Sequence, residues 1–405
     1  MTTAPTFSVI IPVFNKWDLT AACLRSLREH TLEYDYEVIV VDNASSDATA
    51  TELQPLGQSL FGARFCAIRF AENRNFGPAC NAGAVAASAP LLFFLNNDTL
   101  LNPGWSPPLV AALAADPKLG GVGPLLLYEN NAIQHLGVCF EPQSVNHLYR
   151  GFPSEHPLAS RRRHFQAITA AALLMPTGIF RKHNGFHEGY RNGFEDVDLC
   201  LRIRATGKYF SCIPESVVYH LESQTIGRME SEADNAGLLF ERCGHLFRPD
   251  KHLIGLDDGF APFINDWFGI GLCMTAEAEA ALCCEAAGQP FSRWYALSRA
   301  HPLWTAGREV LVQMLEREGR CNDTVFFLAE IAHIKMHIDR YDRLIQAATQ
   351  AGNAEVLALA EATYASLVAA NSNRARPRKF LRQAVERRDR VLAALYEQAL
   401  RESPA

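Results

Sequence analysis

Two continuous apolar runs near the start of the chain predict buried strands. Residues 7–13 (FSVIIPV) and 37–41 (EVIVV) are rich in β-branched side chains and do not alternate with polar residues. This is the pattern of parallel strands that are covered on both faces. Residues 18–30 lie between them and place apolar side chains at helical spacing. The segment therefore predicts a strand, helix, strand unit with a right-handed crossover.

Strands and helices continue to alternate through the first half of the chain. We expect further strands at 64–70, 91–95, 120–128, 132–140, 209–213 and 217–220, and helices at 78–89, after Pro108, at 178–184 and at 195–206. This alternation predicts a doubly wound, Rossmann-like α/β fold for the first domain.

The character of the sequence changes at about residue 256. Long helical patterns replace the strand-like runs, at 305–318, 323–347, 354–370 and 379–402. We predict an α/β domain over 1–255 and an all-α domain over 256–405. The basic run 374–379 (RARPRK) is interpreted as a solvated linker, with contact to phosphate or to a membrane surface as the alternative.

The composition indicates a globular protein but does not identify a binding partner. A hydrophobic content of 48% with 20% charged residues is ordinary for a globular protein. The net charge of -6 gives no general attraction to nucleic acid, so we expect no nucleic-acid partner. The 11 cysteines form no C-x-x-C pair and are interpreted as reduced thiols. With no apolar run of about 20 residues to span a bilayer, we expect a cytoplasmic protein, with peripheral contact to the inner face of the membrane as an alternative.

Polar residues follow four successive predicted strands. They are Pro12, Phe14 and Asn15 after the first, Asp42, Asn43, Ser45 and Asp47 after the second, Asn73, Asn75 and Gly77 after the third, and Asn96, Asn97 and Asp98 after the fourth. One such cluster is typical of a turn or a helix cap. Four of them at the carboxyl edge of one sheet predict a ligand site, because open α/β sheets bind ligands there.

The same segments carry a series of motifs at long intervals. They are VIIPVFN at 9–15, VDN at 41–43, LNNDT at 95–99, PGW at 103–105 and FEDVDLCLR at 194–202. Over about residues 6–247 the chain resembles the inverting family 2 glycosyltransferases with a GT-A fold, and within them a subgroup that includes bacterial surface-polysaccharide and rhamnosyl transferases. The resemblance implies transfer of a sugar from a UDP- or dTDP-sugar to an acceptor hydroxyl, in O-antigen, capsule or glycoprotein synthesis. It does not extend to the helical domain.

A metal site is part of what the resemblance implies. A hard divalent cation, Mn²⁺ or Mg²⁺, offsets the charge that builds as the nucleoside diphosphate leaves. Asp98 is the expected ligand and His220 the implied second one. Asn96 stands where the family's D-x-D motif has its first acid. Because an amide keeps an acceptor oxygen but no charge, Asp98 would carry most of the metal affinity.

The donor is expected along the strand ends. Asp42 would accept the imino N–H of uracil or thymine, with helix capping as the alternative, and the backbone near Phe14 would line the base. Arg228 is expected to contact phosphate from the polar loop 222–232, for which a simple surface loop is the alternative. The full expected donor site is Pro12, Phe14, Asn15, Asp42, Asn43, Asn75, Asn81, Asn96, Asn97 and Arg228.

Displacement with inversion needs a general base beside the attacking hydroxyl. Glu195, Asp196 and Asp198 are candidates. Asp198 stands four residues before Arg202 on a predicted helix and is expected to pair with it. Asp196 matches the family's base position. Glu195 and Trp105 are expected on the acceptor side, with a core position as the alternative for Trp105.

Other functions remain as alternatives. A nucleotidyltransferase would need a Gly-rich basic loop after the first strand, and residues 12–15 (PVFN) supply none. A catalytically inactive nucleotide-sugar-binding scaffold could instead dock a partner through the helical domain. The sequence fixes neither the sugar nor whether the acceptor is a glycan, a glycolipid or a protein. The helical domain is expected to recognise the acceptor or to form a homodimer.

Overall fold

The computed structural model describes residues 4–221 and 231–402, and Arg228 lies outside them. Contacts divide the chain into two compact units, Met1–Cys139 with Val145–Phe247 and Phe140–Ser144 with Arg248–Ala405. The division therefore falls at 247/248, whereas the sequence placed it at 255/256. The hairpin tip 140–144 joins the second unit although its flanking strands belong to the first.

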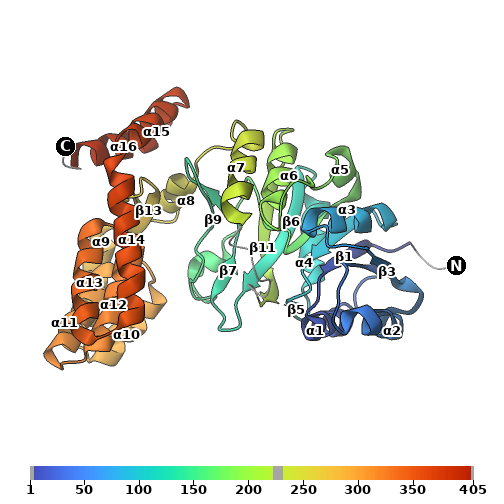
Figure 1. The fold of residues 1–405 in the computed structure, drawn as a ribbon, viewed down its shortest axis with the longest axis horizontal. Helices are drawn as coiled ribbons and strands as arrows, with labels where there is room; N and C mark the ends of the chain where they lie inside the picture. The colour runs from blue at the N-terminus through green and yellow to red at the C-terminus, as the bar shows by residue number, and fades with distance from the viewer. Residues whose placement is uncertain (1–3, 222–230, 403–405) are drawn as a thin grey trace. The chain divides into compact units, whose positions relative to one another are not determined.

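The described residues of the first unit form one mixed sheet of nine strands (Figure 1). The strands are β1 (Phe7–Val13), β2 (Tyr36–Asp42), β3 (Phe65–Arg69), β4 (Leu91–Leu95), β5 (Thr99–Leu101), β6 (Leu119–Leu127), β7 (Ile133–His135), β10 (Ala172–Pro176) and β11 (Tyr209–His220). Their order is β3-β2-β1-β4-β10-β6-β11-β5, with β7 paired to β6. β1 lies parallel to both β2 and β4, so the strand order reverses at β1. The polar residues that follow β1, β2 and β4 thus meet at one edge of the sheet.

Helices cover both faces of this sheet. They are α1 (Trp17–His30), α2 (Thr49–Phe61), α3 (Phe76–Ala86), α4 (Ser106–Ala115), α5 (Thr177–Lys182), α6 (Glu195–Arg204) and α7 (Glu232–Cys243). In Figure 1, α1 and α2 lie below the sheet and α3 and α5 above it. Val9 and Ile11 join the core that includes Leu24 of α1. Ile10 points to the opposite face, where a Cβ on Gly83 of α3 would come within 2.5 Å of it. Burial on both faces explains why the strands read as unbroken apolar runs.

Two strand predictions in this unit differ from the structure. The segment 132–140 forms β7 and β8 (Val138–Phe140), because Gly137 at φ 140 breaks the strand between them. β8 pairs with β9 (Val145–His147). The two expected strands at 209–213 and 217–220 are one irregular strand, β11. Short 3-10 helices occupy Gly62–Arg64 and Pro157–Ser160.

The second unit is helical, as expected, except for one hairpin. Its elements are α8 (Lys251–Asp257), β12 (Phe260–Ile264), β13 (Ile270–Met274), α9 (Ala276–Ala286), α10 (Phe291–Ala300), α11 (Thr305–Arg317), α12 (Cys321–Lys335), α13 (Ile338–Ala351), α14 (Ala354–Ser372), α15 (Ala375–Glu386) and α16 (Arg390–Glu402). The α/β domain followed by a helical region is thus confirmed. Among the described helices, none is both long and apolar enough to cross a membrane.

Left-handed residues split two helices that the sequence predicted as continuous. Met336 at φ 48 ends α12, and Arg388 at φ 58 lies between α15 and α16. The interpretation of 374–379 as a linker was wrong, because α15 begins at Ala375. An arginine-rich segment still forms a helix, since Arg and Lys have good helix propensity.

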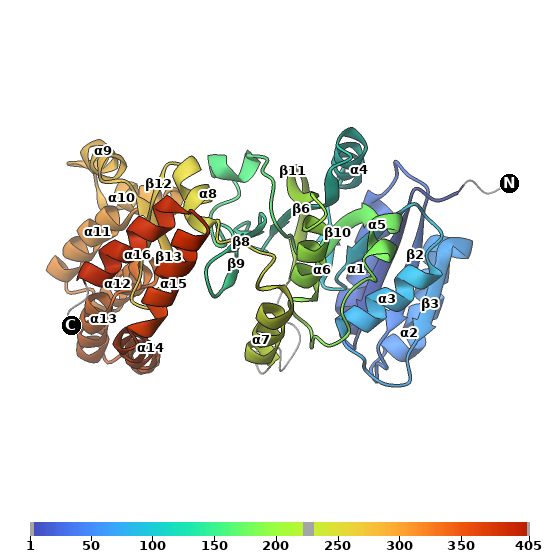
Figure 2. The ribbon, with the colours of Figure 1, turned by 90° about the horizontal axis from the view of Figure 1, so that it is seen from above.

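The second unit has two apolar clusters. The larger one lies among α9–α14 and includes Trp294 and Trp304, whose rings stack at 5.5 Å. The smaller one joins Phe268 near the β12–β13 hairpin to Phe380 of α15 and Tyr396 of α16. The Tyr396 hydroxyl donates to the carbonyl of Phe268 at 2.8 Å. Figure 2 shows α15 and α16 running side by side.

Candidate functional site

The loops that follow β1 and β2 are tied together by hydrogen bonds. Asn15 adopts φ 56, and its N–H donates to Ser45 Oγ at 2.8 Å. Its side-chain Oδ1 accepts the N–H of Ser46 at 2.8 Å. Phe14, one residue earlier, is 44% exposed. The first two predicted clusters therefore come together, with an aromatic side chain open to solvent beside them.

Asp42 is buried at the end of β2 and both of its carboxylate oxygens are engaged. Oδ1 accepts the N–H of Ser45 at 2.8 Å, and Oδ2 pairs with Arg69 at 2.5 Å. Arg69 also donates to the Ser45 carbonyl at 2.8 Å. Asp42 thus bonds within the loop and does not cap α2, which begins at Thr49. Recognition of a base by Asp42 stays a prediction.

Arg69 was not foreseen as part of this edge. It lies opposite Asp42 in the parallel pairing of β2 with β3. An arginine at the end of one strand and an aspartate at the end of its neighbour were visible in the sequence. Only the register shows that they meet.

Asn43 joins the β2 end to the loop before α3. Its Nδ2 donates to the Asn75 carbonyl at 3.2 Å, and its Oδ1 accepts the N–H of Arg74 at 3.2 Å. Asn75 itself adopts φ 68, which Asn tolerates better than most residues. Asn43 and Asn75 thus shape this loop through local hydrogen bonds, and their contact with a donor stays a prediction.

The contacts of Asn81 explain why helix α3 contains an asparagine. Its Nδ2 donates to the Phe186 carbonyl at 2.9 Å, and its Oδ1 accepts the Phe186 N–H at 2.9 Å. This reciprocal pair anchors the loop before α6 to α3. The amide of Asn81 therefore stabilises the loop at Phe186. The expected contact of Asn81 with the sugar donor stays a prediction.

Asp98 and His220 meet across the β5–β11 pairing. His220 lies opposite Thr99 in that antiparallel pair, which brings its Nε2 to 3.1 Å from Asp98 Oδ1. Asn96 Nδ2 also lies 3.1 Å from His220 Nε2. Asn97 points elsewhere and donates to Thr20 Oγ1 at 2.9 Å. Asn96, Asp98 and His220 thus converge on one point, while Asn97 supports α1.

Gln134 of β7 fixes the orientation and the tautomer of His220. Its Nε2 donates to the His220 carbonyl at 2.9 Å, so its Oε1 is the atom 2.6 Å from His220 Nδ1. Because an amide oxygen only accepts, Nδ1 donates a proton to it, which leaves Nε2 as the nitrogen that a metal would use. The sequence analysis missed Gln134, since nothing local marks a glutamine on a short strand.

Asp98 Oδ1 and His220 Nε2 are suited to bind a divalent cation. A carboxylate oxygen and an imidazole nitrogen 3.1 Å apart repel each other unless a proton or a cation lies close to both. A His ligand whose other nitrogen is held by a hydrogen bond is usual in metal sites. The described residues contain no group of three or more His, Cys, Asp or Glu side chains suited to a metal. Diphosphate and water oxygens commonly complete the coordination of such a cation.

A second histidine lies next to Gln134. His135 Nδ1 is 2.9 Å from His147 Nδ1 of β9, and its Nε2 accepts the N–H of Thr169 at 3.3 Å. Burial, together with the positive charge that His147 and His220 would carry, holds the pKa of His135 well below its usual value. His135 is therefore neutral and supports the backbone just before β10.

The same backbone segment positions Asp196. Asp196 Oδ2 accepts the N–H of Ala170 at 2.9 Å, and its Oδ1 accepts the N–H of Val197 at 2.8 Å. One residue further, the Ala171 carbonyl accepts the N–H of Asn96 at 2.9 Å. Residues 169–171 therefore connect the half-buried carboxylate of Asp196 to the β4 end that carries Asp98.

Glu195 is more enclosed than an acceptor-binding residue was expected to be. It is 6% exposed, and its Oε2 accepts the N–H of Gly193 at 2.7 Å. This bond stabilises the turn into α6. Contact of Glu195 with an acceptor stays a prediction.

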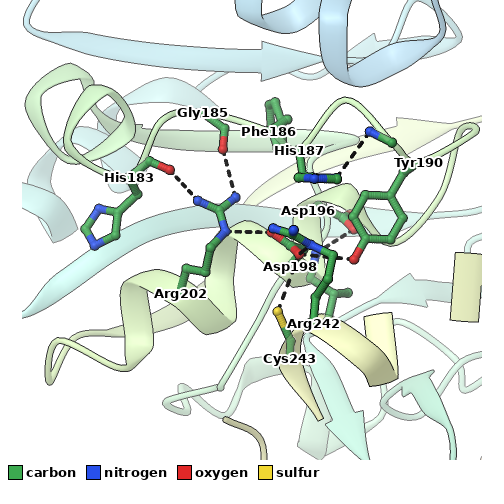
Figure 3. A network of polar contacts seen from close by, with 12 residues as sticks. His183, Gly185, Phe186, His187, Tyr190, Asp196, Asp198, Arg202, Arg242 and Cys243 are labelled. Carbon is green, nitrogen blue, oxygen red and sulfur yellow. Dashed lines mark hydrogen bonds and ion pairs between the residues drawn. The ribbon is translucent and has the colours of Figure 1, made fainter. Parts of the chain in front are cut away.

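Asp198 is the centre of the polar network in Figure 3. Its carboxylate accepts from Arg202 Nε at 2.6 Å and from Arg242 Nε at 2.8 Å. Tyr190 donates its hydroxyl proton to Asp198 at 3.1 Å. Burial acts to raise the pKa of Asp198, but the bonds from Arg242 and Arg202 outweigh it and hold the pKa below its ordinary value. The predicted pairing of Asp198 with Arg202 is confirmed, so Asp198 is structural.

The prediction that Trp105 offers its face to an acceptor was wrong. Trp105 is 1% exposed, with Phe93 stacked at 4.5 Å and Phe7 at its edge. Its Nε1 donates to Thr31 Oγ1 at 3.0 Å. Apolar contacts and a satisfied N–H make Trp105 a core residue.

The fold and the collected side chains define an open α/β domain with a polar site at the switch point of its sheet. Residues 8–135 match the family model described as "Glycosyl transferase family 2". The predicted resemblance of this domain to glycosyltransferase family 2 is thus confirmed.

Two curated relatives resemble the chain over little more than half its length. The uncharacterized protein y4gI of Sinorhizobium fredii is 32% identical over 241 residues, which are 57% of this chain and 26% of that protein. The O-antigen biosynthesis protein RfbC of Myxococcus xanthus is 30% identical over 227 residues, 54% of this chain and 17% of RfbC. The chain thus spans about a quarter or less of these relatives' own lengths.

Solved structures of glycosyltransferases are more distant. The mannosyltransferase PcManGT from Pyrobaculum calidifontis, solved with GDP-Man and Mn²⁺, is 17% identical with a TM-score of 0.46. The match covers 73% of this chain and 79% of that one.

Proposed function

We propose that this chain transfers a sugar from a UDP- or dTDP-sugar to an acceptor hydroxyl, with inversion at the anomeric carbon. The observation that carries the proposal is the connection of Asp196 to the Asp98–His220 pair through residues 169–171. This connection links a carboxylate suited to proton transfer with two side chains suited to bind the metal ion of a nucleoside diphosphate. The match of residues 8–135 to the glycosyltransferase family 2 model supports the same reaction class.

Asp98 and His220 would hold Mn²⁺ or Mg²⁺. When bound, such a cation stabilises the negative charge that develops on the leaving diphosphate. Gln134 keeps His220 Nε2 available for this role by holding the proton on Nδ1. Asn96 adds an amide at 3.1 Å from His220 Nε2 without adding charge.

Asp196 is proposed as the general base. As the acceptor oxygen bonds to the anomeric carbon, the bond from that carbon to the diphosphate oxygen breaks and the hydroxyl proton passes to the Asp196 carboxylate. One displacement of this kind inverts the anomeric centre. The N–H groups of Ala170 and Val197 hold the carboxylate in place, which lowers the cost of positioning it for the transition state.

The biological setting is also a proposal. One relative is named for O-antigen biosynthesis, which supports a role in bacterial glycan synthesis at the cytoplasmic face of the cell envelope. The acceptor would be a glycan, a glycolipid or a protein. The expected donor contact of Arg228 lies outside the described residues.

The first experiment is a thermal-shift panel of UDP-, dTDP- and GDP-sugars with and without Mn²⁺. A ligand that binds only the folded state raises the apparent stability, so one nucleotide class should raise the melting temperature in a metal-dependent way. Asp196→Asn should keep that shift and lose turnover by about 10²–10⁴-fold. Donor binding with neither hydrolysis nor transfer in the wild type would instead support the inactive scaffold. Unimpaired turnover in Asp196→Asn would remove Asp196 from the mechanism.

A further inference from the structure

The segment 374–390 is strongly basic in an acidic chain. It holds eight arginine and lysine residues against two carboxylates, Glu386 and Asp389, a net of +6, whereas the whole chain has a net charge of -6. The structure places this segment on α15 and the turn into α16, within the second unit.

Packing fixes which face of α15 meets solvent. Phe380 and Ala384 are buried in the cluster that holds Tyr396 of α16, and the Phe380 and Tyr396 rings lie 5.6 Å apart. At 100° per residue, Arg378, Lys379 and Arg382 all fall on the opposite side of the helix. Each of these three side chains is exposed.

Five of the basic side chains in this segment form no ion pair with a described carboxylate of the protein. In the part of the chain that the structure describes, no carboxylate forms an ion pair with any of five exposed residues of the segment, which are Arg378, Lys379, Arg382, Arg388 and Arg390. Elsewhere in the same unit, Arg293, Arg299, Arg308, Arg320, Arg340 and Arg343 are each paired with a carboxylate.

Helix stability does not account for the basic run either. The first turns of α9, α12, α13 and α14 each carry an acidic residue, which suits the positive end of a helix dipole. The first turn of α15 has none, and it carries Arg376, Arg378 and Lys379 close to that end. Such cations are unfavourable there, so the helix dipole does not explain the basic run. The first turns of α10 and α11 also lack an acidic residue.

An apolar component accompanies the charge. Val385 lies on the same side of α15 as Arg378 and Arg382 and is 59% exposed, and Val391 at the start of α16 is 36% exposed. A basic helix face with exposed apolar side chains suits an anionic bilayer, where cations meet phosphates and apolar groups enter the head-group layer. A nucleic-acid backbone offers no such layer.

We propose that the exposed face of α15 and the turn into α16, carrying Arg378, Lys379, Arg382, Arg388, Arg390 and Val385, docks on an anionic phospholipid surface. This inference concerns the second unit and does not depend on the proposed transfer reaction. The proposed binding is mainly electrostatic and peripheral.

The test is flotation of the full-length protein with vesicles of phosphatidylcholine alone or mixed with phosphatidylglycerol. Wild type should bind the mixed vesicles at about 0.1 M salt and dissociate at about 1 M, where charges are screened within a few ångströms. The variant Arg378→Gln/Lys379→Gln/Arg382→Gln should partition about 100-fold more weakly. A matched control, Arg25→Gln/Lys182→Gln/Arg317→Gln, removes the same charge from three other exposed positions and should bind like wild type.

Four outcomes would overturn the proposal. They are no binding to the mixed vesicles, equal binding to neutral vesicles, equal weakening of the two triple variants, and binding of duplex DNA without binding of vesicles. Unchanged melting temperatures of both variants show that the comparison is made on folded protein.

Discussion

At the scale of single residues, the proposed metal site depends on a side chain that would not itself bind the metal. Gln134 contacts His220 twice, through the ring nitrogen Nδ1 at 2.6 Å and through the backbone carbonyl at 2.9 Å. These bonds hold the imidazole in the tautomer that presents Nε2 to Asp98. Removing the acceptor at Gln134 would let the ring rotate and take either tautomer.

Gln134→Met keeps the approximate volume and removes the hydrogen bonds. We expect Mn²⁺ affinity in the presence of nucleoside diphosphate to fall by about 10–100-fold, measured by isothermal titration. Gln346→Met, at an exposed position on α13, is the control and should leave the affinity unchanged. Equal affinity of wild type and Gln134→Met would show that His220 is not a ligand or needs no support.

At the scale of elements, Asp198 joins parts of the chain that are distant in sequence. Through Arg202 it stabilises α6 and reaches the Gly185 carbonyl at 2.8 Å in the loop before that helix. Through Arg242 it connects α6 to α7. Asp196 stands two residues earlier on α6, so this network also limits movement of the proposed base.

Asp198→Asn should lower the free energy of unfolding by about 3–5 kcal/mol at pH 7, because it leaves two arginines without their carboxylate. The pKa of Asp198 is lower in the folded protein than its ordinary value. Its stabilising effect is therefore fully present above an unfolded pKa of about 3.9 and is lost as the pH falls through the folded pKa. Urea unfolding at several pH values measures this. A difference between wild type and variant that persists undiminished in acid would contradict the ionic role of Asp198.

At the scale of the whole molecule, the burial of the cysteines indicates which regions exclude solvent. All 11 are free thiols, and six are buried: Cys23, Cys80, Cys139, Cys200, Cys212 and Cys243. The reduced state of the cysteines stays a prediction. Burial raises the pKa of Cys23 to about 12, and burial with the nearby Asp198 charge does the same for Cys243.

Because the thiolate is the reactive form, alkylation should separate the two groups. At pH 8, iodoacetamide should label the exposed Cys66, Cys284 and Cys321 in the native protein and the six buried thiols only after addition of urea. Peptide mapping by mass spectrometry identifies the labelled positions. Labelling of any buried thiol as fast as Cys66 under native conditions would mean that its region opens in solution.

Local sequence patterns were enough to predict the α/β class, the helical second unit and the meeting of polar residues at one edge of the sheet. These features follow from local periodicity and from a topological rule, since residues that end neighbouring parallel strands must lie together. The sequence also identified the Asp198–Arg202 pair, because residues four apart on a helix are neighbours.

The roles of Gln134, Arg69 and Trp105 became visible only in the folded structure. The contact of Gln134 with His220 joins strands that are distant in sequence, and that of Arg69 with Asp42 depends on strand register. Trp105 follows a Pro-Gly turn that reads as exposed, yet the β1 and β4 aromatics Phe7 and Phe93 enclose it. The sequence encodes each residue's chemistry, but contacts between distant segments exist only once the sheet order and the packing of its faces are set.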